Sequence, residues 1–190
     1  MSVDLVNTLL TGFGLSSAAG LNAYIPLLIT GLVARYTSLV QLRAPFDVLE
    51  HPAVLLTLTL LLIIEMGADK IALLDSLNDA INTLVRPAAG AILFAGTSGV
   101  ADIDPSITLV LGLLSAGAVH TTKSATRPAV TAASGGCANP IVSLLEDVVA
   151  VALVLLALLA PVLLAAGFLL AAIWLARLWQ RRRKSLSATT

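Results

Sequence analysis

The sequence predicts an all-α integral membrane protein with about six transmembrane helices. Hydrophobic residues make up 58% of the 190 residues, charged residues make up only 12%, and the mean hydropathy is +0.98. In a soluble domain about a quarter of the residues are charged. We therefore expect a single transmembrane domain over residues 1–180, followed by a basic cytoplasmic tail over residues 181–190.

Four apolar stretches in the first two thirds of the chain are the first predicted spans. A helix needs about 20 residues to cross a bilayer core of about 30 Å. The stretches that approach this length are residues 13–34, 52–66, 72–96 and 106–122. The third of them begins with a charged half and ends in the apolar run PAAGAILFAG.

The C-terminal apolar run provides two more spans. Residues 141–180 would form a helix of about 60 Å at a rise of 1.5 Å per residue, which is too long for one span. Pro161 divides the run, because proline disrupts the interior of a helix. The two pieces are joined by a tight turn or, as the alternative, by a sharp kink.

The basic residues predict the orientation in the inner (plasma) membrane. The run RRRK at residues 181–184 directly follows an apolar segment, so it indicates a cytoplasmic helix end and not nucleic-acid binding. With six spans both termini are cytoplasmic, and so are the loops at Lys70 and at residues 123–127. The acidic loop at residues 97–105 then lies outside. The expected partner is the lipid bilayer. The sequence does not decide whether the chain forms a homo-oligomer.

Short motifs echo between two halves of the predicted domain, residues 13–97 and 106–180. Three spans in each half would make the two copies inverted, as in many secondary transporters. The echoes come in a different order in each half, so chance similarity among small residues is an equal alternative. The echoing pairs are RPAAGA at 86–91 with RPAVTA at 127–132, and SLNDAI at 76–81 with SLLEDV at 143–148.

Two Gly/Pro-interrupted stretches predict broken or re-entrant helices. GLNAYIP contains Asn22 and Pro26, and ASGGCANP contains Asn139 and Pro140. A helix break frees backbone groups that lipid cannot satisfy, so such a break lines a cavity or is covered by protein. Close packing through small residues is the alternative for both stretches. The glycines for which packing is the expected role are Gly20, Gly135 and Gly136.

Charged residues within the apolar segments are the predicted binding site for an ion or a polar solute. Asp75, Asp79, Asn82 and Arg86 lie at i, i+4, i+7 and i+11, on one face of a helix. Charges inside a membrane face the bundle interior and pair with one another, because burying them in lipid costs several kcal/mol. The alternative is that residues 69–86 lie flat at the cytoplasmic interface.

The predicted site has two groups of residues. Its acids outnumber its bases, and an extra buried carboxylate is either protonated or holds a cation. The predicted ion or solute ligands are Glu65, Asp69, Asp75, Asp79, Glu146, Asp147, Asn22 and Asn139. The predicted pairing or gating residues are Lys70, Arg86, Lys123 and Arg127. No cofactor is expected, and a single cysteine, Cys137, without zinc-ligand spacing predicts no structural metal site. The identity of any transported metal stays open.

Several motifs together resemble a bacterial family of small polytopic membrane proteins, the domain of unknown function 4126 family. They are GLNAYIPLL, ALLDSLNDAINT, HTTKSATRPAVTAASGG and SLLEDV. The resemblance runs from about Gly14 to Pro161. It implies a polytopic membrane fold, and it implies no activity and no functional residues.

The segment from Glu65 to Lys70, EMGADK, is also similar to the E-x-G-D-K motif of exchangers that trade calcium or manganese for protons. This resemblance implies a cation site built from acids of two inverted copies. Ala68 is inserted between Gly67 and Asp69, and the second half offers only the acids of Glu146 and Asp147.

A transporter or channel for a small ion or polar solute is therefore the predicted function. A non-catalytic membrane scaffold or accessory subunit is the main alternative, with its charges forming internal salt bridges. An enzyme is not expected. An intramembrane hydrolase would use the G-x-S-G pattern at residues 96–99 and would need Ser98 within hydrogen-bond reach of His120.

Overall fold

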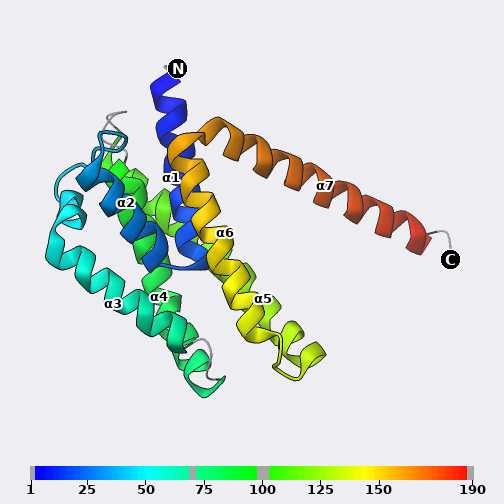
Figure 1. Cartoon of the computed structure of the whole chain (residues 1–190). Coiled ribbons are helices and arrows are strands. Elements are labelled where there is room, and N and C mark those ends of the chain that lie inside the picture. Colours follow the sequence, from blue (N-terminus) through cyan, green and yellow to red (C-terminus); the bar gives the residue numbers. More distant parts are fainter. Residues whose placement is uncertain (1–2, 69–71, 98–102, 188–190) are drawn as a thin grey trace.

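The structure is a computed structural model that describes the backbone of residues 3–68, 72–97 and 103–187. Side chains are described over residues 4–67, 81–97 and 103–177, except that of Leu175. The described residues form helices and no strand, which confirms the all-α fold (Figure 1). The elements are α1 (Val3–Leu21), α2 (Tyr24–Tyr36), the 3-10 helix η1 (Phe46–Glu50), α3 (Pro52–Ala68), α4 (Ala72–Thr97), α5 (Pro105–Ser134), α6 (Asn139–Leu159) and α7 (Pro161–Ser187).

The first predicted span, residues 13–34, is not one helix. α1 runs from the N-terminus at the upper end in Figure 1 into the middle of the bundle, and α2 turns back toward the same end. The turn forms at Asn22, whose Oδ1 accepts hydrogen bonds from the backbone N–H groups of Tyr24 (3.0 Å) and Ile25 (3.1 Å). These bonds satisfy the first amides of α2, so the chain starts a new helix instead of continuing α1. The predicted break is therefore present, in the form of a helical hairpin.

The remaining predicted boundaries agree better with the structure. The span predicted over residues 72–96 corresponds to α4, and the run 141–180 is divided at Pro161 into α6 and α7 as expected. The span predicted over residues 106–122 lies in α5, which continues to Ser134 through an internal proline, Pro128. Figure 1 shows α7 leaving the upper end of α6 and projecting away from the other helices.

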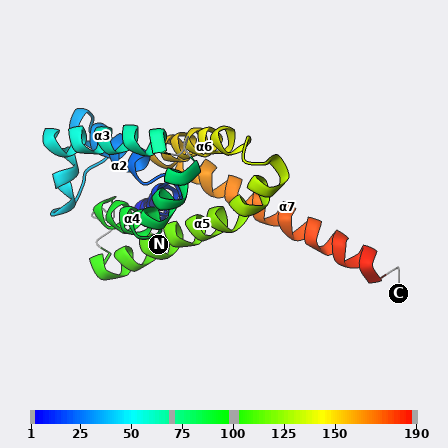
Figure 2. The ribbon, with the colours of Figure 1, turned by 90° about the horizontal axis from the view of Figure 1, so that it is seen from below.

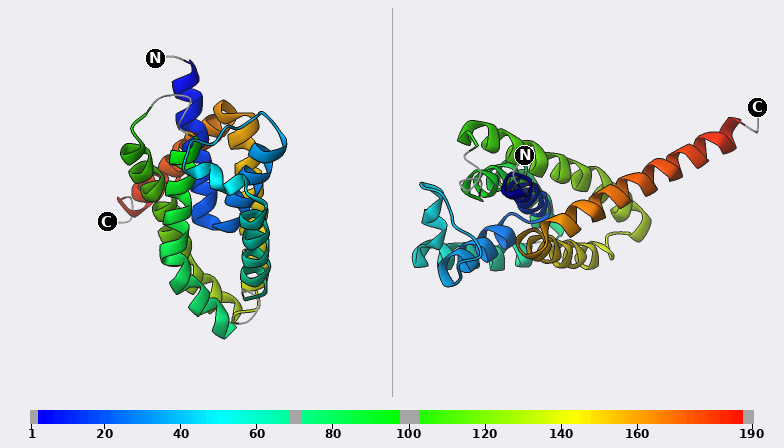
Figure 3. Two further views of the ribbon diagram at one scale, coloured as in Figure 1. Left: turned by 90° about the vertical axis from the view of Figure 1, so that its left-hand side faces the viewer. Right: turned by 90° about the horizontal axis from the view of Figure 1, so that it is seen from above.

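The central helix of the bundle is α1, which contacts α4, α5 and α6 as well as α2 and α7. Figure 2 and the right-hand view of Figure 3 show it almost end-on with α4, α5 and α6 around it. Its buried face includes Leu15 and Ala18, which belong to one hydrophobic core with Leu93, Ala116 and Val154. This packing places the end of α1 between α4, α5 and α6.

Glycines allow two of these helix contacts. A Cβ on Gly112 of α5 would lie 2.3 Å from the carbonyl oxygen of Gly90 on α4, and a Cβ on Gly20 would lie 2.5 Å from the carbonyl oxygen of Ala116. Since real Cβ atoms do not come this close to backbone, the helices approach each other only because glycine has no side chain. The predicted packing role of Gly20 is confirmed.

The same prediction is wrong for Gly135 and Gly136. A Cβ on either residue would meet nothing within 4 Å. Their φ angles are +59° and +86°, in the left-handed region that favours glycine. Gly135 is the C-cap of α5, so the two glycines form the turn into α6 and pack against no helix.

The outer surface of the bundle is apolar, whereas several charged side chains are buried inside. Large hydrophobic side chains are exposed along α3, α5, α6 and α7, among them Leu56, Leu114, Leu144 and Leu169. This pattern is the reverse of a soluble protein, in which charged residues are almost never fully buried. Within the described part of the chain, α5 and α6 are long and apolar enough to cross a membrane, with mean hydropathies of 1.2 and 2.5.

Candidate functional site

The buried charges gather around the tip of the α1–α2 hairpin, in two groups. The Arg86 cluster consists of Glu65 on α3, Asn82 and Arg86 on α4, and His120 on α5. The Lys123 cluster consists of Lys123 and Arg127 on α5, Glu146 on α6, and the carbonyl group of Leu21 at the end of α1. The hairpin therefore ends among charges from four other helices.

The Arg86 cluster is centred on one buried ion pair. Arg86 Nη2 lies 3.1 Å from Glu65 Oε1, and each side chain is only 1% exposed. Asn82 Nδ2 donates to the same oxygen at 3.0 Å. Asn82 and Arg86 are four residues apart on α4, so both reach Glu65 from one helix face.

Histidine 120 completes this cluster in its neutral form. Arg86 Nη1 lies 3.2 Å from His120 Nδ1, and because a guanidinium group has only donors, Nδ1 must accept this hydrogen bond. The ring proton is then on Nε2, which lies 3.3 Å from Thr83 Oγ1 and 3.4 Å from Ser124 Oγ. With the proton on Nε2, either hydroxyl group can accept a hydrogen bond from it.

Thr83 and Ser124 also lie where a proline interrupts the backbone hydrogen bonds of the helix. Thr83 precedes Pro87 of α4 by four residues, and Ser124 precedes Pro128 of α5 by four residues. Proline has no N–H group, so the carbonyl oxygens of Thr83 and Ser124 receive no helical hydrogen bond from it. Helices α4 and α5 are thus both weakened next to His120.

The Lys123 cluster joins three helices through one ammonium group. Lys123 Nζ lies 2.7 Å from Glu146 Oε2, and Arg127 Nη2 lies 3.1 Å from the same atom. Lys123 Nζ also donates to the carbonyl oxygen of Leu21 at 2.9 Å. Lys123 and Arg127 are one helical turn apart, which places both on the face of α5 toward Glu146.

The two ends of the hairpin tip meet groups of opposite charge. The carbonyl end of α1 carries partial negative charge, and it binds the ammonium group of Lys123. The amide end of α2 carries partial positive charge, and its amides bind Asn22, whose Nδ2 donates to Asp147 Oδ1 at 2.9 Å. The hairpin tip is therefore stabilised by residues of α5 and α6.

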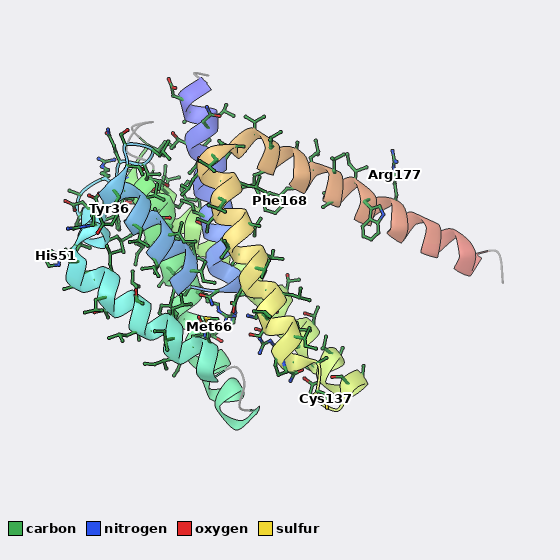
Figure 4. All side chains as sticks on the ribbon, in the orientation of Figure 1. Tyr36, His51, Met66, Cys137, Phe168 and Arg177 are labelled. Atoms are coloured by element: carbon green, nitrogen blue, oxygen red, sulfur yellow. The ribbon has the colours of Figure 1, made fainter. Side chains whose placement is uncertain are left out.

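Two cavities reach this region. One has a volume of about 410 Å³ and touches both Lys123 and Glu146, and the other has a volume of about 380 Å³ and touches Asp147. The first is lined by Leu21, Ala118, Val119, Thr122, Lys123, Thr126 and Glu146. The second lies between α2, α3 and α6 next to Met66, which is labelled in Figure 4. Both are open on one side and have largely apolar linings, and the charged groups lie at their inner edges.

A family model described as domain of unknown function (DUF4126) matches residues 9–181. The chain belongs to this family. No curated protein and no solved structure gives a significant match to the chain. The DUF4126 match confirms the family that the sequence motifs indicated, and its description assigns no activity.

In this DUF4126 chain the structure brings together most of the predicted site residues that it describes. Glu65 meets Arg86, and Glu146 meets both Lys123 and Arg127. Two further predicted residues, Asn22 and Asp147, meet at the hairpin tip.

Other predicted residues lie elsewhere or outside the described part of the chain. Asn139 is seven residues from Glu146, about 10 Å along α6, and accepts a hydrogen bond from Thr131 near the C-terminal end of α5. Asp69 and Lys70 lie outside the described residues, so the resemblance to the E-x-G-D-K motif stays a prediction. Asp75 and Asp79 lie within α4, and their side chains are outside the described part.

The alternative in which residues 69–86 lie flat at the interface does not hold for the described side chains. Asn82 and Arg86 are buried, whereas Ile81 and Leu84 are exposed. The polar face of α4 is therefore turned into the bundle there. Among the residues that the structure describes, no group of three or more His, Cys, Asp or Glu side chains could hold a metal ion.

Two parts of the DUF4126 site were not among the predicted ligands. The helical phase of His120 with Lys123 and Arg127 is visible in the sequence, since residues three, four and seven apart share a face, but His120 was not assigned as a ligand. The role of the Leu21 carbonyl group could not be predicted from the sequence, because a backbone group leaves no mark in the pattern of side chains. This carbonyl group becomes available only because α1 ends there.

Proposed function

We propose that this chain is a bacterial inner-membrane transporter or channel for a small ion or polar solute, and that the tip of the α1–α2 hairpin is its permeation site. The observation that supports this proposal is the gathering of paired buried charges around a helix break that two cavities reach. Irregular backbone at membrane depth is tolerated where it is covered by protein or lines a polar cavity. Sites of this kind occur in secondary transporters.

A membrane location accounts for the inverted distribution of polarity. Exposed leucines and isoleucines on α3, α5, α6 and α7 would face lipid, and the charged clusters would face the bundle interior. Soluble monomers rarely expose large contiguous apolar patches, so these exposed side chains support a membrane location.

The hairpin also changes the expected topology. In the proposed arrangement α1 and α2 form a re-entrant pair, and α3 to α7 cross the membrane. The N-terminus then lies on the same side as the loop after Tyr36 (Figure 4), not on the cytoplasmic side as the six-span count predicts. The cytoplasmic side holds the end of α3, the start of α4, the α5–α6 turn and the C-terminal RRRK run, so the positive-inside rule is still obeyed.

A flux assay in proteoliposomes tests the proposed function. The wild-type protein is reconstituted and loaded with a panel of alkali cations, ammonium, protons, divalent cations and small anions. We expect flux of at least one of them, and we expect Glu146→Gln to lower it by about tenfold or more, which corresponds to about 1.4 kcal/mol. Asp47→Asn, at an exposed acid in η1, is the matched control and should leave the flux unchanged. Absence of flux for every solute would contradict the proposal.

A membrane scaffold is the second candidate, and one observation favours it. Glu65, Glu146 and Asp147 all have hydrogen-bond or ion-pair partners in the bundle, as internal stabilisation would require. For a scaffold, substitutions in both clusters lower stability and none changes a flux. The same proteoliposome experiment therefore separates the two functions.

The hydrolase alternative receives no such support. His120 binds Arg86, which lies about 16 Å along α4 from Thr97, the last residue of that helix. Ser98 itself is outside the described residues.

A further inference from the structure

The ammonium group of Lys123 is held between two oxygen atoms that lie far apart in the sequence. Its Nζ atom lies 2.9 Å from the carbonyl oxygen of Leu21 and 2.7 Å from Glu146 Oε2. The Lys123 residue is only 6% exposed. The lysine therefore places a compact positive charge at the open end of α1.

The two oxygens are suitable cation ligands by themselves. The carbonyl groups in the last turn of a helix have no intrahelical partner and carry the negative end of the helix dipole. In transporters with broken helices, such carbonyl groups bind the coupling cation. Glu146 supplies a full negative charge beside the Leu21 carbonyl group.

The composition of this position favours a monovalent cation. It offers one carboxylate and one backbone carbonyl, whereas divalent cations in proteins are held by several oxygen ligands that include carboxylates. The described residues contain no group of three or more acidic, histidine or cysteine side chains that could hold a metal ion. A primary ammonium group already fits between the two oxygens, so an ion of similar size and charge fits as well.

We propose that the Leu21 carbonyl oxygen and Glu146 Oε2 form a binding site for a compact monovalent cation, such as potassium, sodium or ammonium, and that Lys123 occupies this site as a tethered competitor. This inference rests on the proposed function and names the ion class that the hairpin tip would bind. A free cation binds when the lysine side chain leaves the two oxygens.

The cavity of about 410 Å³ beside the two oxygens can accommodate the ion and the displaced lysine head group. It is lined by Leu21, Lys123 and Glu146, so it opens directly at the proposed site. A water molecule occupies about 30 Å³ of liquid volume, so this open hollow has room for a small ion beside the displaced ammonium group. The lysine stem is flexible, and its head can move into the cavity without a change in the backbone.

Arg127 has a different role from Lys123 in this proposal. It binds the same Glu146 oxygen at 3.1 Å, and it keeps that carboxylate in position when Lys123 leaves. Removal of Arg127 would leave the lysine at both oxygens. Arg127→Gln is therefore a charge-matched control for Lys123→Gln, since each variant loses one positive charge next to Glu146.

The test is cation binding by the purified protein in detergent. Thermal stability is titrated with potassium, sodium or ammonium chloride against N-methylglucamine chloride at constant ionic strength, because a ligand that binds only the folded state raises Tm. Lys123→Gln should bind at least one small cation about tenfold or more tightly than the wild type does. Lys123→Arg and Arg127→Gln should show no such gain, and the double variant Lys123→Gln/Glu146→Gln should lose it. A response of Lys123→Gln equal to that of the wild type, or one that survives loss of Glu146, would overturn the proposal.

A second measurement needs only the wild-type protein, in case Lys123→Gln does not fold. Potassium or sodium should increase the modification of Lys123 by an amine-specific reagent, because a displaced ammonium group enters the cavity. The modified peptide is quantified by mass spectrometry, with N-methylglucamine as the reference cation. Unchanged modification of Lys123 in both alkali cations would also overturn the proposal.

The outcomes separate this inference from the proposed function. Cation binding by Lys123→Gln without flux through the wild-type protein would support the site and contradict transport. Flux through the wild-type protein without a gain of cation binding in Lys123→Gln would contradict the site and support transport.

Discussion

Arg86 Nη2 on α4 lies 3.1 Å from Glu65 Oε1 on α3, and both side chains are almost completely withdrawn from solvent. Asn82 of α4 donates to the same Glu65 oxygen, so one carboxylate oxygen of α3 binds two side chains of α4. A buried ion pair of this kind is costly to break, because removal of one partner leaves the other charge buried and uncompensated.

The variant Arg86→Met should therefore lower the free energy of unfolding by about 3–5 kcal/mol. Glu65→Leu/Arg86→Met should recover part of this loss, since no buried charge of the pair remains. Stability is measured by denaturant unfolding in detergent, and Arg35→Met at an exposed arginine serves as the control, with an expected change below about 1 kcal/mol. A loss for Arg86→Met no larger than that for Arg35→Met would show that the pair contributes little.

The crossing of α4 and α5 leads to a prediction about helix packing. Gly112→Ala would place a Cβ 2.3 Å from the Gly90 carbonyl oxygen, so it should destabilise the fold by about 1–3 kcal/mol. Gly117 lies on the same helix, and a Cβ there would meet its nearest neighbour at 3.9 Å. Gly117→Ala should therefore be neutral or slightly stabilising, because alanine favours the helix. Equal thermal stability of the two variants would contradict the close approach.

The proposed topology can be tested with the natural cysteine. Cys137 is the only cysteine of the sequence, and it is exposed in the α5–α6 turn (Figure 4). A membrane-impermeant maleimide should label it in inverted vesicles and leave it unlabelled in spheroplasts.

In a Cys137→Ser background, a cysteine at Asp4 should show the opposite pattern if the N-terminus lies outside. Labelling of both positions from the same side would exclude the re-entrant arrangement and favour the six-span count. Cys137→Ser alone gives the background signal.

The acidic stripe of α4 gives a prediction for transport. If Asp75 and Asp79 are ion ligands, Asp75→Asn and Asp79→Asn should each lower flux in proteoliposomes by about tenfold or more, since each substitution removes a negative charge from the path. Asp47→Asn again provides the matched control. Unchanged flux in both variants would remove these two residues from the site.

The sequence could predict those parts of the fold that depend on composition and on proline. The boundary at Pro161 and the extent of α4 agree with the structure, because a proline and a run of apolar residues act locally. The break expected at GLNAYIP is present, but the reversal of direction between α1 and α2 was not predicted, because mean hydropathy does not report the direction of a helix. The reversal depends on Asn22 binding the first amides of α2, which is a matter of local geometry.

The sequence could predict that the charged residues of this apolar chain pair with one another inside the bundle. Helical phase placed Arg86 and Lys123 on inward faces, and the structure confirms both positions. The pattern could not show which acid each base would bind, since partners on different helices are brought together only by packing. Asn22 and Asn139 lie in stretches of similar composition, yet they have different positions in the structure. Asn22 binds Asp147 at the hairpin tip, whereas Asn139 binds Thr131 next to the α5–α6 turn.

The contact between Gly90 and Gly112 also determines how the bundle can deform. No side chain separates the two helices there, so the crossing has no rotamers to rearrange and acts as a fixed pivot. Pro87 and Pro128 lie on the same side of that pivot, toward the α5–α6 turn, and they are the points at which α4 and α5 bend most easily. Bending at these prolines would change the spacing between α5 and α6 around Lys123 while the upper half of the bundle stays intact.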